Sequence, residues 1–283
     1  MKENNIHGAR RQFLLGMAGV GVAALLPTGV AFAAGITDIG DAINKAGRQR
    51  MLSQRMAKAY CQIGLGILPG RSEKILALSL QRFSDQLAEL KAYAPTPDVK
   101  ESYAELDKLW RRYQSLLSGK PNLENARLIA TLNEDVLRTA HLATTQLELH
   151  AASNVGRLIN VAGRQRMLSQ RMAKFYMFRQ WGIKSASMEQ EAQLARREFI
   201  SALDALGKAQ ENDSAIKNEL ELARMQWLFF DEALKQQDVG GKDMMTYATN
   251  VATTSERLLE VMDRVTGHYA RISAASSTPE RKR

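Results

Sequence analysis

The sequence predicts an all-α protein built from two tandem antiparallel four-helix bundles. An 18-residue segment occurs twice, at residues 43–60 and 159–176, with 16 of 18 positions identical and a constant offset of 116 residues. That offset is far longer than the repeat of a solenoid, so it indicates a duplicated domain. The segments between proline and glycine breaks show the 3.6-residue periodicity of helices and no alternating β-branched runs.

Weaker similarities extend the duplication beyond the 18-residue segment. Trp110 and Trp227 lie 117 residues apart, while Ala130-Thr131 recurs as Ala248-Thr249 at an offset of 118. Small insertions in loops would account for the change in offset.

The first 33 residues predict an export signal that does not belong to the fold. An arginine pair at residues 10–11 precedes an uncharged apolar stretch, and Ala31-Phe32-Ala33 has the small-x-small pattern of a signal-peptidase site. We therefore expect residues 1–33 to form a twin-arginine signal peptide, with cleavage after Ala33 and a periplasmic product. The alternative is a protein anchored in the inner membrane by an uncleaved signal, because residues 13–36 carry no charge.

Each unit carries four predicted helices. In the first unit, residues 34–150, we expect helices near 37–67, 72–93, 97–118 and 122–150. In the second unit, residues 151–276, we expect them near 154–182, 187–210, 213–237 and 242–274. The polar tail, residues 277–283, is expected to be disordered.

Local signals mark several of the helix ends. Thr96-Pro97-Asp98 supplies an N-cap, a proline at the first helical position and an acid in the first turn. Ser187 to Gln190 fits a capping box. Leu68-Pro69-Gly70 and Val239-Gly240-Gly241 are helix breakers. Short connections between amphipathic helices favour an antiparallel up-down bundle in each unit.

The junction between the units allows two arrangements. Between Asn122 and Trp181 there is no proline, so the last helix of the first unit could continue into the second unit and stack the bundles end to end. A turn at residues 151–154 would place them side by side instead.

Charge and composition narrow the function. The chain has a formal charge of +9, and a basic balance favours anionic partners. Because we expect the protein to be exported, we expect no nucleic-acid partner. Cys61 is the only cysteine, so no intramolecular disulfide forms, and the residue is expected to be a small buried hydrophobe. We find no metal-ligand spacing, nucleophile motif or phosphate loop, and therefore expect no catalytic residue, metal or cofactor.

The repeated helix has one face that suits a ligand. On a helical wheel a glycine, an arginine and a glutamine share a stripe with small residues. Small residues let another helix approach closely, and a buried arginine then needs an anion; its planar guanidinium matches an oxyanion. The candidate ligand-binding residues are Gly47, Arg50 and Gln54 in the first copy and Gly163, Arg166 and Gln170 in the second. The arginines pointing elsewhere are expected to form surface ion pairs: Arg48, Arg55, Arg164 and Arg171.

The repeated segment, INKAGRQRMLSQRMAK in its first copy, resembles the P-box of nitrate/nitrite sensor kinases of the NarX type. It is also similar to the related N-terminal domain of type IV pilus methyl-accepting transducers, the PilJ type. The resemblance implies a four-helix bundle that dimerises through its first helix. It also implies nitrate between two first helices, held by the arginine that precedes the methionine, here Arg50 and Arg166. The lysine of that helix matches Lys45, whereas the second copy has Val161.

One departure is common to both copies. Where the sensor kinases have Ser-Tyr-Arg, this chain has Ser53-Gln54-Arg55 and Ser169-Gln170-Arg171, which is closer to the PilJ type.

We interpret the chain as a ligand-binding sensory module for a small oxyanion such as nitrate or nitrite. It shows no HAMP linker, kinase domain or methyl-accepting coiled coil, so we expect it to act through a partner, either a membrane receptor or a second copy as a homodimer. The alternative is a periplasmic structural or adaptor protein that binds a receptor or envelope protein through the same helices.

Overall fold

Eight α-helices make up the regular structure of the described residues, with no β-strand among them. The computed structural model describes residues 35–236 and 243–277, which belong to one compact unit spanning Ala34–Arg283. The predicted signal peptide, its cleavage site, the Val239-Gly240-Gly241 breaker and the tail beyond residue 277 lie outside the described residues. None of the described helices is both long enough and apolar enough to span a membrane.

The helix bounds confirm the predicted elements within a few residues. The first four helices are α1 Ile39–Gly64, α2 Pro69–Tyr93, α3 Pro97–Ser118 and α4 Leu123–Ala151. The second four are α5 Asn154–Gln180, α6 Ala186–Gly207, α7 Ser214–Lys235 and α8 Met244–Ser277.

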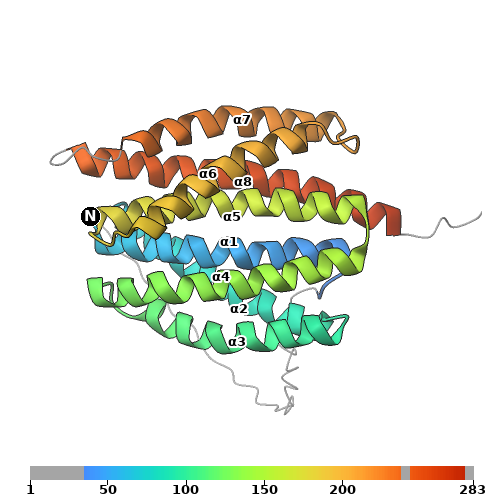
Figure 1. Cartoon of the computed structure of the whole chain (residues 1–283), viewed down its shortest axis with the longest axis horizontal. Helices are drawn as coiled ribbons and strands as arrows, with labels where there is room; N and C mark the ends of the chain where they lie inside the picture. The colour runs from blue at the N-terminus through green and yellow to red at the C-terminus, as the bar shows by residue number, and fades with distance from the viewer. Residues whose placement is uncertain (1–34, 237–242, 278–283) are drawn as a thin grey trace, which may run out of the picture. The chain divides into compact units, whose positions relative to one another are not determined.

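The two bundles lie side by side, with α1 and α5 adjacent at the centre (Figure 1). In the first bundle α1 packs on α2 and α4, and α3 packs on α4. In the second bundle α5 packs on α6 and α8, and α7 packs on α8. The most extensive helix pairing is that of α1 with α5, so each copy of the repeated segment faces the other copy.

A tight turn decides between the two junction arrangements. Helix α4 ends at Ala151, and Ala152 takes a left-handed backbone conformation with φ 46°. The Ser153 side chain then accepts a hydrogen bond from the Gly156 amide at 3.1 Å, which caps α5. The chain therefore reverses at residues 151–154 and does not continue as one helix.

Other helix ends follow the predicted signals, with one correction. The Thr96 side chain caps α3 through the Val99 amide, and Pro97 is its first residue. The capping box predicted from Ser187 is wrong. The cap of α6 is Ser185, which accepts from the Met188 amide at 3.1 Å. Because methionine stands where the box needs a glutamate or glutamine, Ser185 caps the helix alone.

The aromatic cores of the two bundles repeat each other. In the first bundle Phe83 stacks on Trp110, with ring centroids 4.1 Å apart, and Tyr113 meets the same indole edge-on. In the second bundle Phe199 stacks on Trp227 at 4.5 Å, and a phenylalanine, Phe230, makes the edge contact. The two tryptophans, 117 residues apart in sequence, therefore occupy equivalent positions in the two bundles.

The register predicted for the last helices is wrong. Thr144 and Thr266 occupy equivalent positions, because both are buried and each hydroxyl donates to the backbone carbonyl four residues earlier. The offset between α4 and α8 is thus 122 residues, whereas the recurring Ala-Thr pairs suggested 118. The difference is four residues, about one helical turn. Either register puts the same residues on the same face, so periodicity could not separate them.

We predict that the first turn of α1 does not tolerate a side chain at Gly40. A Cβ at Gly40 would lie 2.7 Å from the Cβ of Ser273 in α8, and that atom cannot rotate away. We expect Gly40→Ala to lower the free energy of unfolding by about 1–3 kcal/mol in urea denaturation, because the helices must move apart. In the control, Gly70→Ala, the new Cβ meets nothing within 4 Å. That variant should be neutral or slightly stabilising. Equal losses in both variants would contradict the packing of α1 on α8.

Candidate functional site

The two central helices cross in near contact at a pair of glycines. A Cβ built on Gly47 of α1 would lie 3.8 Å from the Cα of Gly163 in α5, and the reciprocal distance is 3.9 Å. The neighbouring Ala46 and Ala162 are also buried. Small side chains thus allow this approach, as the stripe on the helical wheel predicted.

Arg50 and Arg166 converge on the glycine pair. Both side chains have an exposed fraction of 0 %. The Cβ position of Gly47 lies 3.2 Å from Nη2 of Arg50 and 3.4 Å from Nη2 of Arg166. Four of the predicted site residues therefore come together at the α1–α5 contact, and we call this group the arginine seam: Gly47, Arg50, Gly163 and Arg166.

Each seam arginine crosses to the opposite helix. Nη2 of Arg50 donates to the side-chain oxygen of Asn160 at 2.7 Å and to its carbonyl at 3.3 Å. Nη2 of Arg166 donates to the carbonyl of Asn44 at 3.1 Å. Asn44 and Asn160 occupy the same position in the two copies, so a local twofold relation links the halves of the seam. These hydrogen bonds tie α1 to α5.

The two arginines differ in their counter-ions. Nη1 of Arg166 forms an ion pair with Asp263 of α8, which also pairs with Arg48 at 3.2 Å. Nη1 of Arg50 instead contacts Nδ1 of His141 in α4 at 3.1 Å. With the offset of 122, His141 and Asp263 occupy equivalent positions. Within the described residues Arg50 forms no ion pair.

Burial and neighbouring positive charges lower the pKa values of both seam arginines. Burial, followed by the charges of Arg164 and Arg166, lowers the pKa of Arg50 to about 9. Burial lowers the pKa of Arg166 to about 10, although Asp263 opposes the change. Burial alone would raise the pKa of Asp263, but the charges of Arg166 and Arg48 lower it to about 2. At neutral pH Asp263 is therefore ionised and gives Arg166 a direct counter-ion.

His141 is neutral at the same pH. Burial, with the charges of Arg50 and Arg164, lowers its pKa to about 4. The nearest carboxylate influence on Arg50 comes from Glu148, which accepts a hydrogen bond from the Asn160 side-chain amide. The Asn160 side chain thus lies between the Arg50 guanidinium and this carboxylate.

A second buried polar layer lies farther along the central helices and centres on two lysines. Lys58 of α1 donates to Gln170 at 2.6 Å and to Ser255 at 3.1 Å, and it pairs with Glu256 at 2.6 Å. Both its side chain and that of Lys174 have an exposed fraction of 0 %. Each contact of Lys58 reaches the second bundle, so the lysine connects the two halves.

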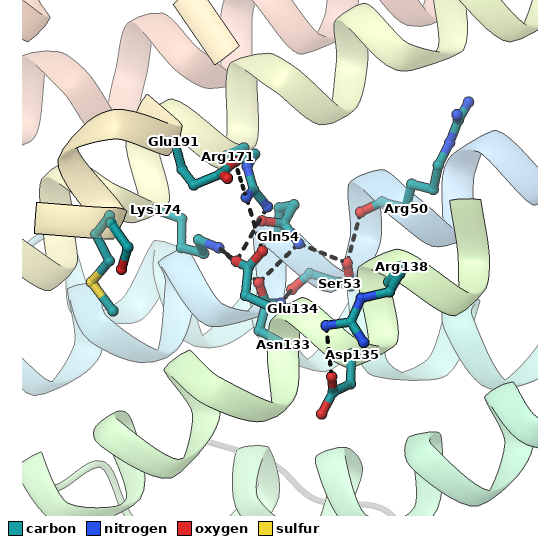
Figure 2. Close-up of polar contacts among 12 residues, drawn as sticks. Arg50, Ser53, Gln54, Asn133, Glu134, Asp135, Arg138, Arg171, Lys174 and Glu191 are labelled. Atoms are coloured by element: carbon teal, nitrogen blue, oxygen red, sulfur yellow. Dashed lines mark hydrogen bonds and ion pairs between the residues drawn. The ribbon is translucent and has the colours of Figure 1, made fainter. Parts of the chain in front are cut away.

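Lys174 of α5 mirrors Lys58. Its Nζ donates to Asn133 at 2.8 Å and pairs with Glu134 at 2.7 Å, both on α4 of the first bundle. Gln54 donates to the same Asn133 oxygen at 2.9 Å. Figure 2 shows Gln54, Asn133 and Lys174 in one group, with the Arg50 guanidinium directed away from it. Gln54 and Gln170, predicted as ligand-binding residues, therefore lie in the lysine layer and not beside the guanidinium groups.

The remaining P-box arginines form ion pairs, as predicted, but not all of them lie at the surface. Arg164 pairs with Glu198 at 2.8 Å and remains partly exposed. Arg171 is buried and pairs with both Glu134 and Glu191. Arg55 donates through Nε and Nη2 to the buried Glu256. Arg55 and Arg171 thus share their carboxylate partners, Glu256 and Glu134, with Lys58 and Lys174.

Cys61 is the small buried residue that the sequence predicts. Cys61 is buried and free, and burial raises the pKa of its thiol. Lys45 pairs with Asp41 and Glu89. No group of three histidine, cysteine, aspartate or glutamate side chains placed for a metal ion occurs in residues 35–236 and 243–277.

The hydrogen-bond and ion-pair partners of the repeated arginines and lysines were not predicted from the sequence. Lys58 and Lys174 were identical between copies, and that identity is the signal that could have revealed them. The partners of these lysines lie on α8 and α4, whose sequences are less similar to each other. The true offset between these two helices differs by one helical turn from the offset that the sequence suggests, so their equivalent residues were not recognised. The missed residues are Asn44, Asn160, Asn133, Glu134, His141, Ser255, Glu256 and Asp263.

Comparison with known families now decides the relationship. The PilJ family, described as the type IV pili methyl-accepting chemotaxis transducer N-terminal domain, matches residues 37–138 and again residues 148–254. The chain belongs to this family. It carries the PilJ domain twice, and the matches cover both copies of the arginine helix. His141 and Asp263 lie outside both matched ranges. Searches of curated proteins and of solved structures find no match.

The lysine layer is predicted to hold the halves together. Although burial would raise the pKa of Glu256, the charges of Lys58 and Arg55 lower it to about 2 from an ordinary 4.5. Glu256→Gln leaves Lys58 buried without its counter-ion, so we expect urea denaturation at pH 7 to show a loss of about 3–5 kcal/mol. Because the folded-state pKa is depressed, this stabilisation is complete above pH 4.5 and disappears as the pH falls towards 2.

The control for this substitution is Glu232→Gln, which removes an exposed partner of Lys235. Its loss should stay below about 1 kcal/mol. A Glu256 variant no less stable than this control would show that the Lys58 pair does not hold the bundles together.

Proposed function

We propose that this PilJ protein is an anion-sensing module that binds one small oxyanion at the arginine seam and passes the signal to a partner. The observation that carries the proposal is the buried Arg50 guanidinium, which has no ion pair among the described residues at a point where a second guanidinium also converges. Nitrate and nitrite are the first ligands to test, given the resemblance of the P-box to that of nitrate/nitrite sensor kinases.

A buried cation without a partner is strongly unfavourable, and an anion that accepts hydrogen bonds from it removes much of that cost. The Nε atoms of Arg50 and Arg166 have no hydrogen-bond partner in the described structure. Each charge-assisted hydrogen bond contributes about 1.5–3 kcal/mol. Three or four such bonds supply the ~8 kcal/mol of a micromolar complex.

The geometry also limits the ligand. The helices approach to near van der Waals contact at the glycine pair, so a bulky anion would have to separate them. A planar ion with two or three oxygens fits the fork of a guanidinium. The seam therefore favours nitrate-sized anions over phosphate esters or larger acids.

Signalling follows from the position of the site. The seam is the contact between the two bundles, and Arg50 is hydrogen-bonded to Asn160 of α5, so an anion that changes the contacts of Arg50 also changes the relation of α1 to α5. The family description, a chemotaxis transducer N-terminal domain, supports a sensory role. In this chain a membrane receptor or a second copy would read that change.

A second candidate function is a structural or adaptor role. Helix α7 exposes an apolar stripe at helical spacing: Met225, Leu228 and Phe229, with exposed fractions of 52 %, 68 % and 64 %. Such a stripe favours contact with another protein. This reading requires no small ligand, and the ligand experiment below separates the two functions.

We also propose that the protein acts in the periplasm after twin-arginine export. The arginine pair at residues 10–11 and the Ala31-Phe32-Ala33 pattern support this localisation. Replacing both arginines with lysine should prevent the mature protein from reaching the periplasm, because that pathway reads the arginine pair. Cell fractionation followed by immunoblotting measures the outcome. Normal export and cleavage of the double-lysine variant would contradict the twin-arginine assignment.

The anion site is tested by removing one guanidinium. In the parent protein, nitrate or nitrite should raise the melting temperature, because a ligand that binds only the folded state stabilises it. Arg50→Gln should weaken binding by at least about 10-fold in calorimetric titration, since it removes charge-assisted donors.

The matched control is Arg111→Gln, which removes the same charge from an exposed side chain that pairs with Asp107. This variant should bind like the parent. Equal losses in both variants would indicate diffuse attraction to a basic surface. A parent protein that binds none of the small oxyanions would leave the adaptor role.

A further inference from the structure

We propose that the site at Arg50 takes up one small anion together with one proton, and that His141 carries that proton. The second half of the seam needs no ligand, because Asp263 is its built-in anion. This inference rests on the anion-sensing function proposed above and specifies which half of the seam binds and what controls the affinity.

The hydrogen-bond chemistry of the Arg50–His141 contact fixes the state of the free protein. A guanidinium has only donors, so Nδ1 of His141 must be the acceptor in the 3.1 Å contact with Nη1 of Arg50. His141 is therefore neutral, with its proton on Nε2. A proton added to Nδ1 would turn two donors towards each other and break the contact. Protonation of His141 and its hydrogen bond to Arg50 exclude each other.

An anion reverses this relation. Its oxygens can accept from Nη1 of Arg50 and from a protonated Nδ1 of His141 at the same time, so the proton gains a partner. The negative charge also offsets Arg50 and Arg164, whose positive charges help to hold the pKa of His141 down. The bound anion thus favours the proton, and by linkage the proton favours the anion to the same extent.

His141 lies between a surface groove and the buried Arg50. A groove of about 310 Å³ between α4, α5 and α6 is lined by His141, which is only partly buried, while Arg50 lies behind it with no exposed surface. The charged or titratable groups that line this groove or act on Arg50 and His141 are Arg50 on α1, Tyr103 on α3, Glu134, Arg138 and Glu148 on α4, Arg164 and Arg171 on α5, and Glu191 and Glu198 on α6.

The groove charges pair with each other. Arg164 pairs with Glu198, and Arg171 pairs with Glu134 and Glu191. Arg138 pairs with Asp135, as Figure 2 shows. Among the groove cations and the arginine behind them, only Arg50 has no carboxylate partner within the described structure. An anion entering this groove therefore gains most at Arg50 and His141.

The other half of the protein supplies an internal comparison. Where the first bundle has His141, the second has Asp263, whose carboxylate is paired with Arg166. The same seam geometry therefore already holds one planar, singly charged group with two oxygens. This comparison assigns the ligand class: nitrate, nitrite or a small carboxylate.

A third group distinguishes the first bundle. The hydroxyl of Tyr103 in α3 is buried, with 1 % exposure, and has no hydrogen-bond partner in the described structure. Burial raises its pKa, and the charge of Arg50 acts against that rise. With the tryptophan offset of 117, its counterpart in the second bundle is Leu220. The half that carries its own anion thus has an apolar residue where the proposed binding half has a free donor.

Calorimetric titration of the purified protein with nitrate tests the inference. Nitrate stays ionised between pH 5.5 and 8.0, so any pH dependence comes from the protein. We expect binding at least about 30-fold tighter at pH 5.5 than at pH 8.0, because uptake of one proton per nitrate changes the affinity about tenfold per pH unit. Titrations in two buffers with different ionisation enthalpies should show uptake approaching one proton per nitrate at pH 5.5 to 7.

Two variants at one position sharpen the test. His141→Gln cannot take the proton, so it should bind nitrate with the same affinity at both pH values and without proton uptake. His141→Asp supplies the counter-ion that Arg166 already has, so it should bind no nitrate and should melt at a higher temperature than the parent in the absence of anion.

The outcomes separate the two proposals. Nitrate binding that is independent of pH and unchanged in His141→Gln would overturn proton coupling and leave the anion-sensing function intact. Undiminished nitrate binding by His141→Asp would overturn the placement beside Arg50. If nitrate, nitrite and formate all fail to bind at either pH, the anion-sensing function fails, and this inference fails with it.

Discussion

The close approach of α1 and α5 at Gly47 and Gly163 is the constraint on which the rest of the molecule depends. It places two arginines in the core between two bundles, where water cannot solvate them. Each guanidinium then needs acceptors on the opposite helix, and the carbonyls of Asn44 and Asn160 provide them. Farther along the helices Lys58 and Lys174 are also buried, and they too find their acceptors on the opposite bundle. Polar groups buried in this way fix the register of the two helices, since a shifted register would leave charges without partners.

Because the two domains belong to one chain, equivalent positions can carry different residues, which a symmetric homodimer does not allow. In a homodimer with twofold symmetry both arginines would face the same residue, because the two surfaces are identical. Here the two counter-ion positions have diverged to His141 and Asp263. The shared elements keep the helices together, while the divergent ones make the halves unequal. A single-chain PilJ protein can therefore hold one arginine permanently neutralised and leave the other to respond to its surroundings.

The sequence predicted the elements of this fold well because helix signals are local. The repeat identified α1 and α5, and Thr96-Pro97 marked the start of α3. The cap of α6 was misplaced by two residues, since Ser185 and Ser187 are equally good caps and only the backbone conformation selects one. The glycine and arginine stripe predicted the seam correctly, because a close helix crossing requires small residues on one face.

The rest of the site could not be read from the sequence, because it depends on contacts between distant segments. Gln54 and Gln170 share the stripe with the arginines, yet they lie about one turn along the helix and reach Asn133 and Ser255 instead. The counter-ions on α4 and α8 follow an offset that the helical period leaves ambiguous. His141 and Asp263 have different chemistry, and no pattern marks them as equivalent until the bundles are seen side by side.

The central claim is that the first half of the seam, and not the second, recruits an external anion. Anomalous diffraction from crystals soaked in sodium bromide tests it most directly, because bromide is a small monovalent anion that can be located without ambiguity. The account predicts a bromide ion within hydrogen-bond distance of the Arg50 guanidinium and His141, with none beside Arg166. Bromide bound equally at both arginines, or only at exposed lysines and arginines on the surface, would contradict it.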